Sequence, residues 1–134
     1  MSLVAFPYKV YKGTPCPIVP VEISGPTHWI RTEAYVDSGA FYSIFSHHEA
    51  NAMGINLVKG KQIFATVGDG GAIPVFLHKL KIRFGKLEFP ALVGFSPRLG
   101  VGFNLLGRYD FFSRFDVTFS DCTRFVFFSA RSNR

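Results

Sequence analysis

Short apolar runs alternate along this chain with breaks rich in glycine and proline, which is the pattern of β-strands joined by turns. Residues 18–23 and 28–36 form two such runs, and the break Ser24-Gly25-Pro26-Thr27 between them predicts a hairpin. The second run leads directly to Asp37. The pattern therefore places one carboxylate at the end of an apolar strand.

Two further hairpins are predicted downstream. Residues 62–67 and 73–78 are extended runs joined by Gly68-Asp69-Gly70-Gly71, whose glycines permit positive backbone angles and a flexible tip. Residues 79–84 and 87–93 pair around Gly85-Lys86, and basic and apolar residues alternate through 79–84 with the period of a half-buried strand. Many short strands at this spacing favour a β-barrel or β-sandwich.

One short helix is expected at about 47–53. Ser46 and Glu49 form the Ser-x-x-Glu pattern of a capping box, and Gly54 stands where a helix would stop. The chain leaves little room for more helix, so the predicted fold is mainly β.

The remaining apolar runs are two predicted strands in the C-terminal third. Residues 104–107 begin one of them. The run 124–128 is unusually apolar for a strand near a terminus, and an exposed edge of that kind would invite pairing with another chain.

Length and composition limit the classes of protein. With 134 residues, 48% of them hydrophobic and sixteen of them Phe, the chain is expected to be a single domain, 1–134, with ample material for a core. Apolar stretches are too short to span a bilayer, and the N-terminus lacks a signal-peptide pattern. We therefore expect no membrane association of this segment and a cytoplasmic location. The segment can also be a piece cut from a longer chain.

Cys16 and Cys122 show no zinc or CxxC spacing and are interpreted as reduced thiols, with a disulfide bridge between them left open.

Several kinds of site have weak support in the sequence. The charge of +6 permits an anionic partner, but no nucleic-acid motif accompanies it, so a basic β-barrel that binds nucleic acid is the least favoured hypothesis. His47-His48-Glu49 lacks a metal-ligand spacing and is interpreted as a surface helix, so no metal site is predicted. The 68–71 loop lacks the ending of a phosphate loop, residues 100–105 lack the last glycine of a dinucleotide fingerprint, and no Gly-x-Ser-x-Gly occurs.

Asp37 is different because several features line up around it. An apolar strand runs into Asp37-Ser38-Gly39-Ala40, a helix starts soon after, a glycine-tipped hairpin follows, and a later apolar strand ends in Leu105-Leu106-Gly107-Arg108. A carboxylate is costly to place among apolar residues unless something pairs with it or uses it. The order of these features favours a catalytic role over a simple turn.

This layout resembles the retropepsin-like aspartic proteases from about residue 17 to residue 121. The resemblance implies a closed β-barrel with a flap hairpin and one or two short helices. It implies that Asp37 is catalytic, one per protomer, that Ser38 hydrogen-bonds across a dimer beneath the aspartates, and that Gly39 permits a tight turn. The 68–72 hairpin would be the flap that closes over a peptide.

The resemblance also implies the other site residues. An extended peptide would add to the site like a strand, with alternate side chains entering apolar pockets. Phe41, Tyr42 and Ile73 are candidate pocket walls, although core packing is as good an account of each. The implied substrate-binding residues are Ala40, Phe41, Gly70, Gly71, Ala72 and Ile73; the implied structural residues are Leu105, Leu106, Gly107 and Arg108.

One departure from the family concerns the residues after Ala40. Retroviral members carry two acidic residues there, one of which pairs with the later arginine, whereas this chain has Phe41 and Tyr42. Arg108 is therefore expected to pair with Asp110 or to point outward.

The chemistry of carboxylates explains why a dimer is required. Peptide hydrolysis needs one ionised carboxylate to take a proton from water and a second, protonated one to polarise the carbonyl, and two such groups held close together share a proton. The chain supplies only one such residue, so the hypothesis is a homodimeric aspartic endopeptidase with no cofactor. The alternative is a non-catalytic dimerisation or peptide-binding module with the same fold.

Overall fold

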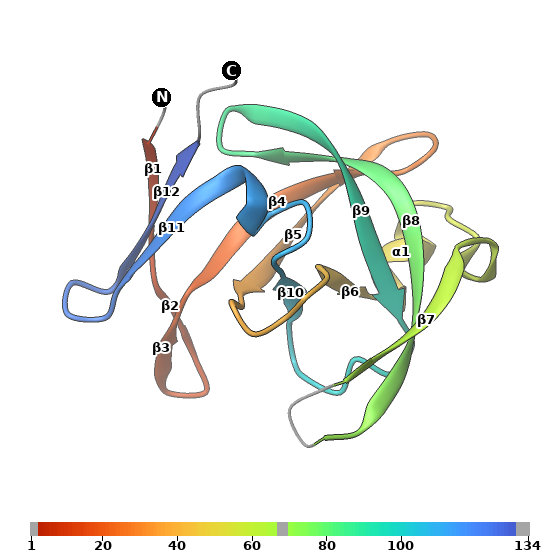
Figure 1. Ribbon diagram of the computed structural model, residues 1–134. Helices are drawn as coiled ribbons and strands as arrows, with labels where there is room; N and C mark the ends of the chain where they lie inside the picture. The colour runs from red at the N-terminus through yellow and green to blue at the C-terminus, as the bar shows by residue number, and fades with distance from the viewer. Residues whose placement is uncertain (1–2, 67–69, 131–134) are drawn as a thin grey trace.

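The computed structural model describes residues 3–66 and 70–130 (Figure 1). The elements, in chain order, are β1 (Leu3–Pro7), β2 (Lys9–Tyr11), β3 (Thr14–Cys16), β4 (Ile18–Ser24), β5 (Trp29–Val36), β6 (Ile44–Ser46), α1 (His47–Ala52), the 3₁₀ turn η1 (Leu57–Lys59), β7 (Lys61–Thr66), β8 (Ala72–Phe84), β9 (Leu87–Ser96), β10 (Asn104–Leu106), the 3₁₀ turn η2 (Phe112–Arg114), β11 (Phe115–Ser120) and β12 (Phe125–Ala130). Strands dominate, as the alternation of apolar runs and turns predicted.

The main sheet closes on itself. Its strands follow the order β4-β5-β10-β6-β9-β8-β7, and an additional pairing between β4 and β8 completes a ring from which β7 extends along β8 (Figure 1). The predicted runs 73–78 and 79–84 are one continuous strand, β8, which bends around the ring and pairs with β7 at one end and β4 at the other. Closure leaves the inward side chains in a common interior.

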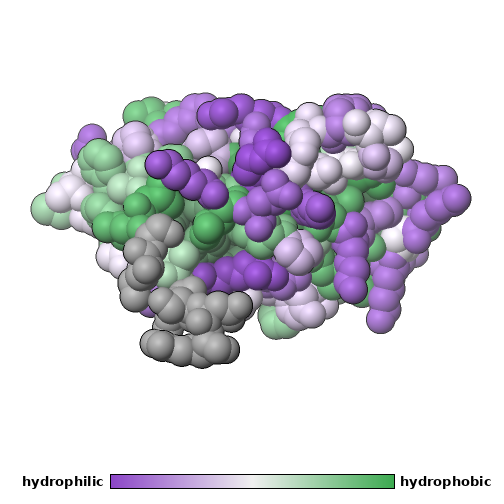
Figure 2. Space-filling view, turned by 90° about the horizontal axis from the view of Figure 1, so that it is seen from above, coloured by the Kyte–Doolittle hydropathy of each residue, from purple (hydrophilic) through white to green (hydrophobic). Residues whose placement is uncertain are grey.

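The interior is filled by aromatic and β-branched side chains. Along β4, Val19, Val21 and Ile23 are almost fully buried, as expected for alternate residues of a strand that faces a core. Phe84 lies edge-on to Phe128, with ring centroids 4.8 Å apart, so the ring and the terminal strands share one core. Hydrophilic residues cover much of the face of the molecule that is seen in Figure 2.

The two ends of the chain form a second sheet in the order β1-β12-β11. β12 lies in the middle, with Phe127 paired to Ala5 on one side and to Thr118 on the other. The prediction that the apolar run 124–128 would be an exposed edge is therefore wrong. The long-range pairing with β1, about 120 residues away in the chain, could not be read from the local pattern.

The helix forms where it was predicted, with one change at its start. Ser46 caps α1, since its hydroxyl accepts a hydrogen bond from the His48 N–H at 3.2 Å. The Glu49 carboxylate does not complete the capping box; it is bonded to Thr32 and Asn104 of neighbouring strands. A tertiary partner has replaced the local one.

Two further expectations concerned disulfide bonds and membrane-spanning helices. Cys16 and Cys122 are both free thiols. In the part of the chain that the structure describes, no helix is long and apolar enough to cross a membrane.

Candidate active site

Asp37 lies where two parallel strands end side by side. β5 ends at Val36, which is paired with Leu106 at the end of β10, and the Asp37 N–H donates to the Leu106 carbonyl at 2.9 Å. The chain then turns back through 38–43 into β6, which pairs with the other edge of β10. Insertion of β10 between β5 and β6 holds the Asp37 loop from both sides.

The turn after Asp37 orients its carboxylate. Gly39 N–H donates to Asp37 Oδ1 at 2.8 Å, and Ala40 N–H donates to the Asp37 carbonyl at 3.2 Å. The side chain therefore shapes its own turn, and it does so while half-buried at the rim of a hollow. Asp37 can therefore be both a turn residue and a site residue, because the hydrogen bond from the Gly39 N–H stabilises the turn and orients the carboxylate.

The segment after β10 fastens this loop. A Cβ atom on Gly107 would lie 2.4 Å from the Tyr42 carbonyl oxygen and 2.9 Å from that of Ala40, so no larger residue fits there. The Gly107 N–H donates to the buried Ser43 hydroxyl at 2.9 Å, and the Arg108 N–H donates to the Ala40 carbonyl at 2.9 Å. The Leu-Leu-Gly-Arg segment thus packs directly against the Asp-Ser-Gly-Ala segment.

Arg108 does not use the partner suggested by the sequence. Its guanidinium donates to the Ser38 carbonyl at 3.1 Å. Asp110 instead accepts from the Leu92 N–H at 2.8 Å and lies 3.7 Å from Arg114. Of the two expectations for Arg108, the pair with Asp110 is wrong, since Asp110 faces β9, whereas the side chain of Arg108 is exposed.

A hollow of about 980 Å³ lies beside Asp37. β7, the segment before β10 and the Asp37 loop all contribute to its lining; the lining residues are Tyr35, Asp37, Gly39, Ala40, Phe41, Tyr42, Ile44, Ile63, Phe64, Ala65, Thr66, Leu99, Val101, Phe103 and Leu105. The lining is largely apolar and aromatic. Such a surface suits alternate side chains of an extended polypeptide.

The other predicted site residues are distributed differently. Ile73 is buried in a cluster with Val75 and Leu77 and packs in the core rather than lining the hollow. Gly70, Gly71 and Ala72 are exposed where β8 begins, and Gly70 has a φ of +87°. Residues 67–69, which include Gly68 and Asp69 of the predicted flap tip, lie outside the described residues.

Tyr35 is a lining residue that the sequence reading did not single out. It lies two residues before Asp37, so both side chains leave the strand on the same face, and its ring stacks on Phe103 with centroids 4.9 Å apart. Burial raises the pKa of the Tyr35 hydroxyl, and electrostatic interactions with Cys16, Asp37 and Asp121 add to the effect. Tyr35 therefore stays protonated at neutral pH. The position of Tyr35, two residues before Asp37, was the feature of the sequence that could have identified it.

Tyr8 has a similar environment close by. Its hydroxyl donates to Asp121 Oδ1 at 2.7 Å. Burial and this hydrogen bond raise the pKa of Tyr8 from 10.0 to about 12.

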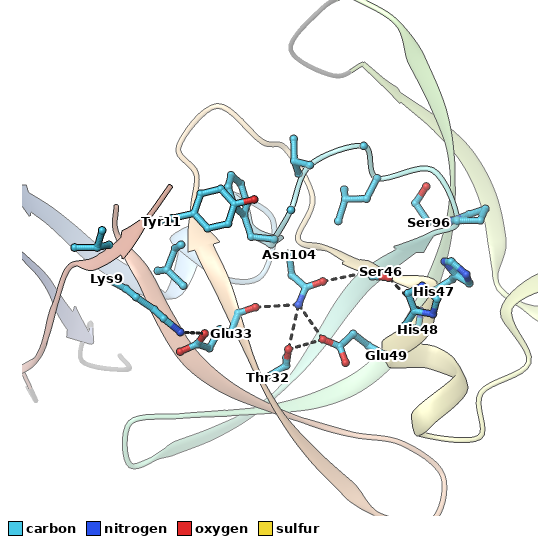
Figure 3. A pocket seen from close by; sticks show the side chains of 18 residues that line it. Lys9, Tyr11, Thr32, Glu33, Ser46, His47, His48, Glu49, Ser96 and Asn104 are labelled. Carbon is cyan, nitrogen blue, oxygen red and sulfur yellow. Dashed lines mark hydrogen bonds and ion pairs between the residues drawn. The ribbon is translucent and has the colours of Figure 1, made fainter. Parts of the chain in front are cut away.

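A second hollow, of about 820 Å³, lies across the segment before β10 (Figure 3). Leu99, Val101 and Phe103 line both hollows and separate them. The side chains that line this second hollow are more polar than those of the Asp37 hollow, and they include an ion pair between Lys9 and Glu33. In the described part of the chain, no group of three or more His, Cys, Asp or Glu side chains could hold a metal ion.

Asn104 lies at the centre of this second hollow and ties three strands together. Its Nδ2 donates to the Glu33 carbonyl at 2.9 Å, to Glu49 Oε2 at 3.0 Å and to Thr32 Oγ1 at 3.2 Å, while its Oδ1 accepts from the Ser46 N–H at 2.8 Å (Figure 3). Only 6% of Asn104 is exposed. It therefore links β5, β6 and β10, the strands that carry the Asp37 loop.

Comparison with known proteins supports the fold. No family model and no curated protein matches the sequence. Among solved structures, a retropepsin-like aspartic protease from Rickettsia conorii is 16% identical, with 98% of this chain and 95% of that chain covered and a TM-score of 0.62. EIAV protease complexed with the inhibitor HBY-793 is 19% identical, with 75% of this chain and 88% of that chain covered and a TM-score of 0.53.

These likenesses confirm the predicted resemblance at the level of the fold. The match to the Rickettsia structure covers nearly the whole chain, so it also includes terminal residues outside the 17–121 region on which the sequence resemblance depended.

Proposed function

We propose that this protein is an aspartic endopeptidase in which two Asp37 carboxylates, one from each chain of a homodimer, activate a water molecule. The observation that supports this most is the placement of Asp37 at the rim of a largely apolar hollow, on a loop fastened by Gly107 and Arg108. The fold shared with retropepsin-like proteases agrees with it.

The reaction follows from the pairing of the two carboxylates. Two like charges held within hydrogen-bonding distance do not both ionise, so one Asp37 is ionised and the other keeps a proton. The ionised carboxylate takes a proton from water, whose oxygen attacks the peptide carbonyl carbon while the protonated carboxyl donates a hydrogen bond to the carbonyl oxygen. The C–N bond of the tetrahedral intermediate then breaks as the carboxyl that took the proton from water gives it to the leaving amine nitrogen, which restores one ionised and one protonated Asp37. No covalent bond to the protein forms.

The other residues position these groups. The Gly39 N–H holds one oxygen of Asp37 and so aims the carboxylate. Ser38 is exposed beside it and, in the proposed dimer, hydrogen-bonds across to the partner beneath the aspartates. The β7–β8 hairpin, with Gly70 to Ala72 at the start of β8, covers an extended peptide whose alternate side chains enter the hollow.

Replacing Asp37 with asparagine tests the proposal. Asparagine keeps the shape and can still accept the Gly39 hydrogen bond, but it cannot take a proton from water. We expect Asp37→Asn to lower cleavage of a peptide library by about 10²–10⁴-fold from acidic to neutral pH. Circular dichroism and sedimentation should show the fold and dimer unchanged.

Asp116→Asn is the matched control, because Asp116 is an exposed aspartate on β11 that does not line the hollow. It should cleave like the wild type. Cleavage by Asp37→Asn at the wild-type rate would refute the assignment. A wild-type dimer that binds peptides and never cuts them would assign the hollow to peptide binding instead.

A further inference from the structure

A partly exposed aromatic cluster, formed by exposed Phe41, half-buried Tyr42 and exposed Tyr109, lies beside Asp37. Ring centroids are 4.9 Å apart for Phe41 and Tyr42, 5.6 Å for Tyr42 and Tyr109, and 5.9 Å for Phe41 and Tyr109. Phe41 is 61% exposed and Tyr109 is 44% exposed. Aromatic rings gathered at a surface are the residues that most often anchor protein interfaces.

The cluster is held rigidly to the loop that carries Asp37. The Tyr109 N–H donates to the Phe41 carbonyl at 2.7 Å, one residue beyond the bond from the Arg108 N–H to the Ala40 carbonyl. These bonds join the two segments that supply the three rings. A surface ordered in advance loses little conformational entropy when a partner covers it.

Substrate in the Asp37 hollow does not account for the whole cluster. Phe41 and Tyr42 line that hollow, but Tyr109 does not. The cluster therefore extends from the rim of the hollow onto the outer surface. A peptide confined to the hollow would leave Tyr109 exposed to water.

The pairing of two Asp37 residues limits which surface a second copy must cover. Asp37 and Ala40 are joined by a turn hydrogen bond of 3.2 Å, so Phe41 lies within about 11 Å of Asp37. A second copy that brings its Asp37 within hydrogen-bonding distance must pack over this neighbourhood. The contact is symmetric, so the same surface is used by both copies.

The apolar strand β12 has no free edge on which a second copy could pack, because β1 and β11 pair with its two sides.

We infer that the Phe41–Tyr42–Tyr109 cluster is the surface on which a second copy of this chain packs, thereby bringing the two Asp37 carboxylates together. This inference rests on the proposed function and names the contact that completes its site.

The test measures dimerisation of the whole chain by sedimentation equilibrium. We expect Tyr109→Ala and Phe41→Ala each to raise the dimer dissociation constant about tenfold or more, since each change occurs twice in a symmetric dimer. Tyr109→Phe keeps the ring and should stay within about threefold of the wild type.

Phe64→Ala is the matched control for loss of an exposed aromatic ring. Phe64 is 68% exposed and lines the Asp37 hollow from β7, outside the cluster. Its loss should change peptide cleavage and leave the dissociation constant within about threefold. Circular dichroism of each variant establishes that the fold is retained, and the two alanine variants test the surface independently.

The outcomes separate this inference from the proposed function. Unchanged dissociation constants for both alanine variants, with cleavage abolished by Asp37→Asn, overturn the interface alone. A dimer weakened by the alanine variants, with full cleavage by Asp37→Asn, overturns the catalytic role alone. A wild-type chain that stays monomeric at every concentration overturns both.

Discussion

Replacing Gly107 with alanine should displace the loop that carries Asp37. The added Cβ would lie 2.4 Å from the Tyr42 carbonyl oxygen, 2.6 Å from the Tyr42 carbonyl carbon and 2.9 Å from the Ala40 carbonyl oxygen. All three are backbone atoms, so no side-chain rotation relieves the clash. The two segments must separate by about 1 Å to restore a normal contact distance.

The energetic cost of this separation has two parts. Overpacking of a well-filled site costs about 1–3 kcal/mol. The hydrogen bonds from the Arg108 N–H to Ala40 and from the Tyr109 N–H to Phe41 are stretched, at about 1 kcal/mol each. We therefore expect Gly107→Ala to lower the free energy of unfolding by about 3–5 kcal/mol. A 1 Å displacement of Asp37 should also lower the cleavage rate by about 10²-fold.

Urea unfolding and peptide cleavage measure these two effects. Gly54→Ala is the control, because no atom lies within 4 Å of its added Cβ and only its φ of +73° is unfavourable for alanine. That substitution should cost about 1–2 kcal/mol and leave the cleavage rate of the folded protein unchanged. If Gly107→Ala is no less stable than Gly54→Ala and cleaves at the wild-type rate, the close packing of the two segments does not position Asp37.

Two further predictions concern hydrogen bonds on either side of the site. Asn104→Ala should lower the free energy of unfolding by about 2–4 kcal/mol in urea, because it strips buried partners from Glu49 and Ser46; a loss below about 0.5 kcal/mol would contradict the role of Asn104 in joining the strands. Protonated Tyr8 contributes stability that is fully present below pH 10 and is lost as the pH rises towards its folded pKa of about 12, so Tyr8→Phe should flatten the decline in unfolding free energy between those values. Denaturation at a series of pH values measures this, and a decline as steep as in the wild type would show that Tyr8 is not its cause.

The extent of sequence-based prediction differs between elements for physical reasons. Strands β4 and β5 and helix α1 were predicted nearly residue by residue, because period-two burial and a capping serine are properties of neighbouring residues. The predicted role of Glu49 in the capping box was wrong, because Thr32 and Asn104 bind its carboxylate instead. Local signals predict structure well only where no distant partner offers a better bond.

The candidate site shows the same division. The resemblance to retropepsin-like proteases implied that the segments of Asp37 and Gly107 belong to one site, and the structure brings these two segments into contact. The partner of Arg108 was beyond reach, and for Ile73 the sequence could not decide between a pocket wall and core packing, since each depends on which segment lies across from it.

The amino-acid sequence by itself determined that this protein is built mainly of strands, that one aspartate ends an apolar strand, and that glycines stand where the backbone must turn or approach closely. Those are properties of adjacent residues. Only the tertiary structure decided that β12 is an inner strand, that a hollow opens beside Asp37 and that three aromatic rings gather at its rim. Such features arise when residues far apart in the chain pair across a closed ring, where burial of shared apolar surface outweighs local preference.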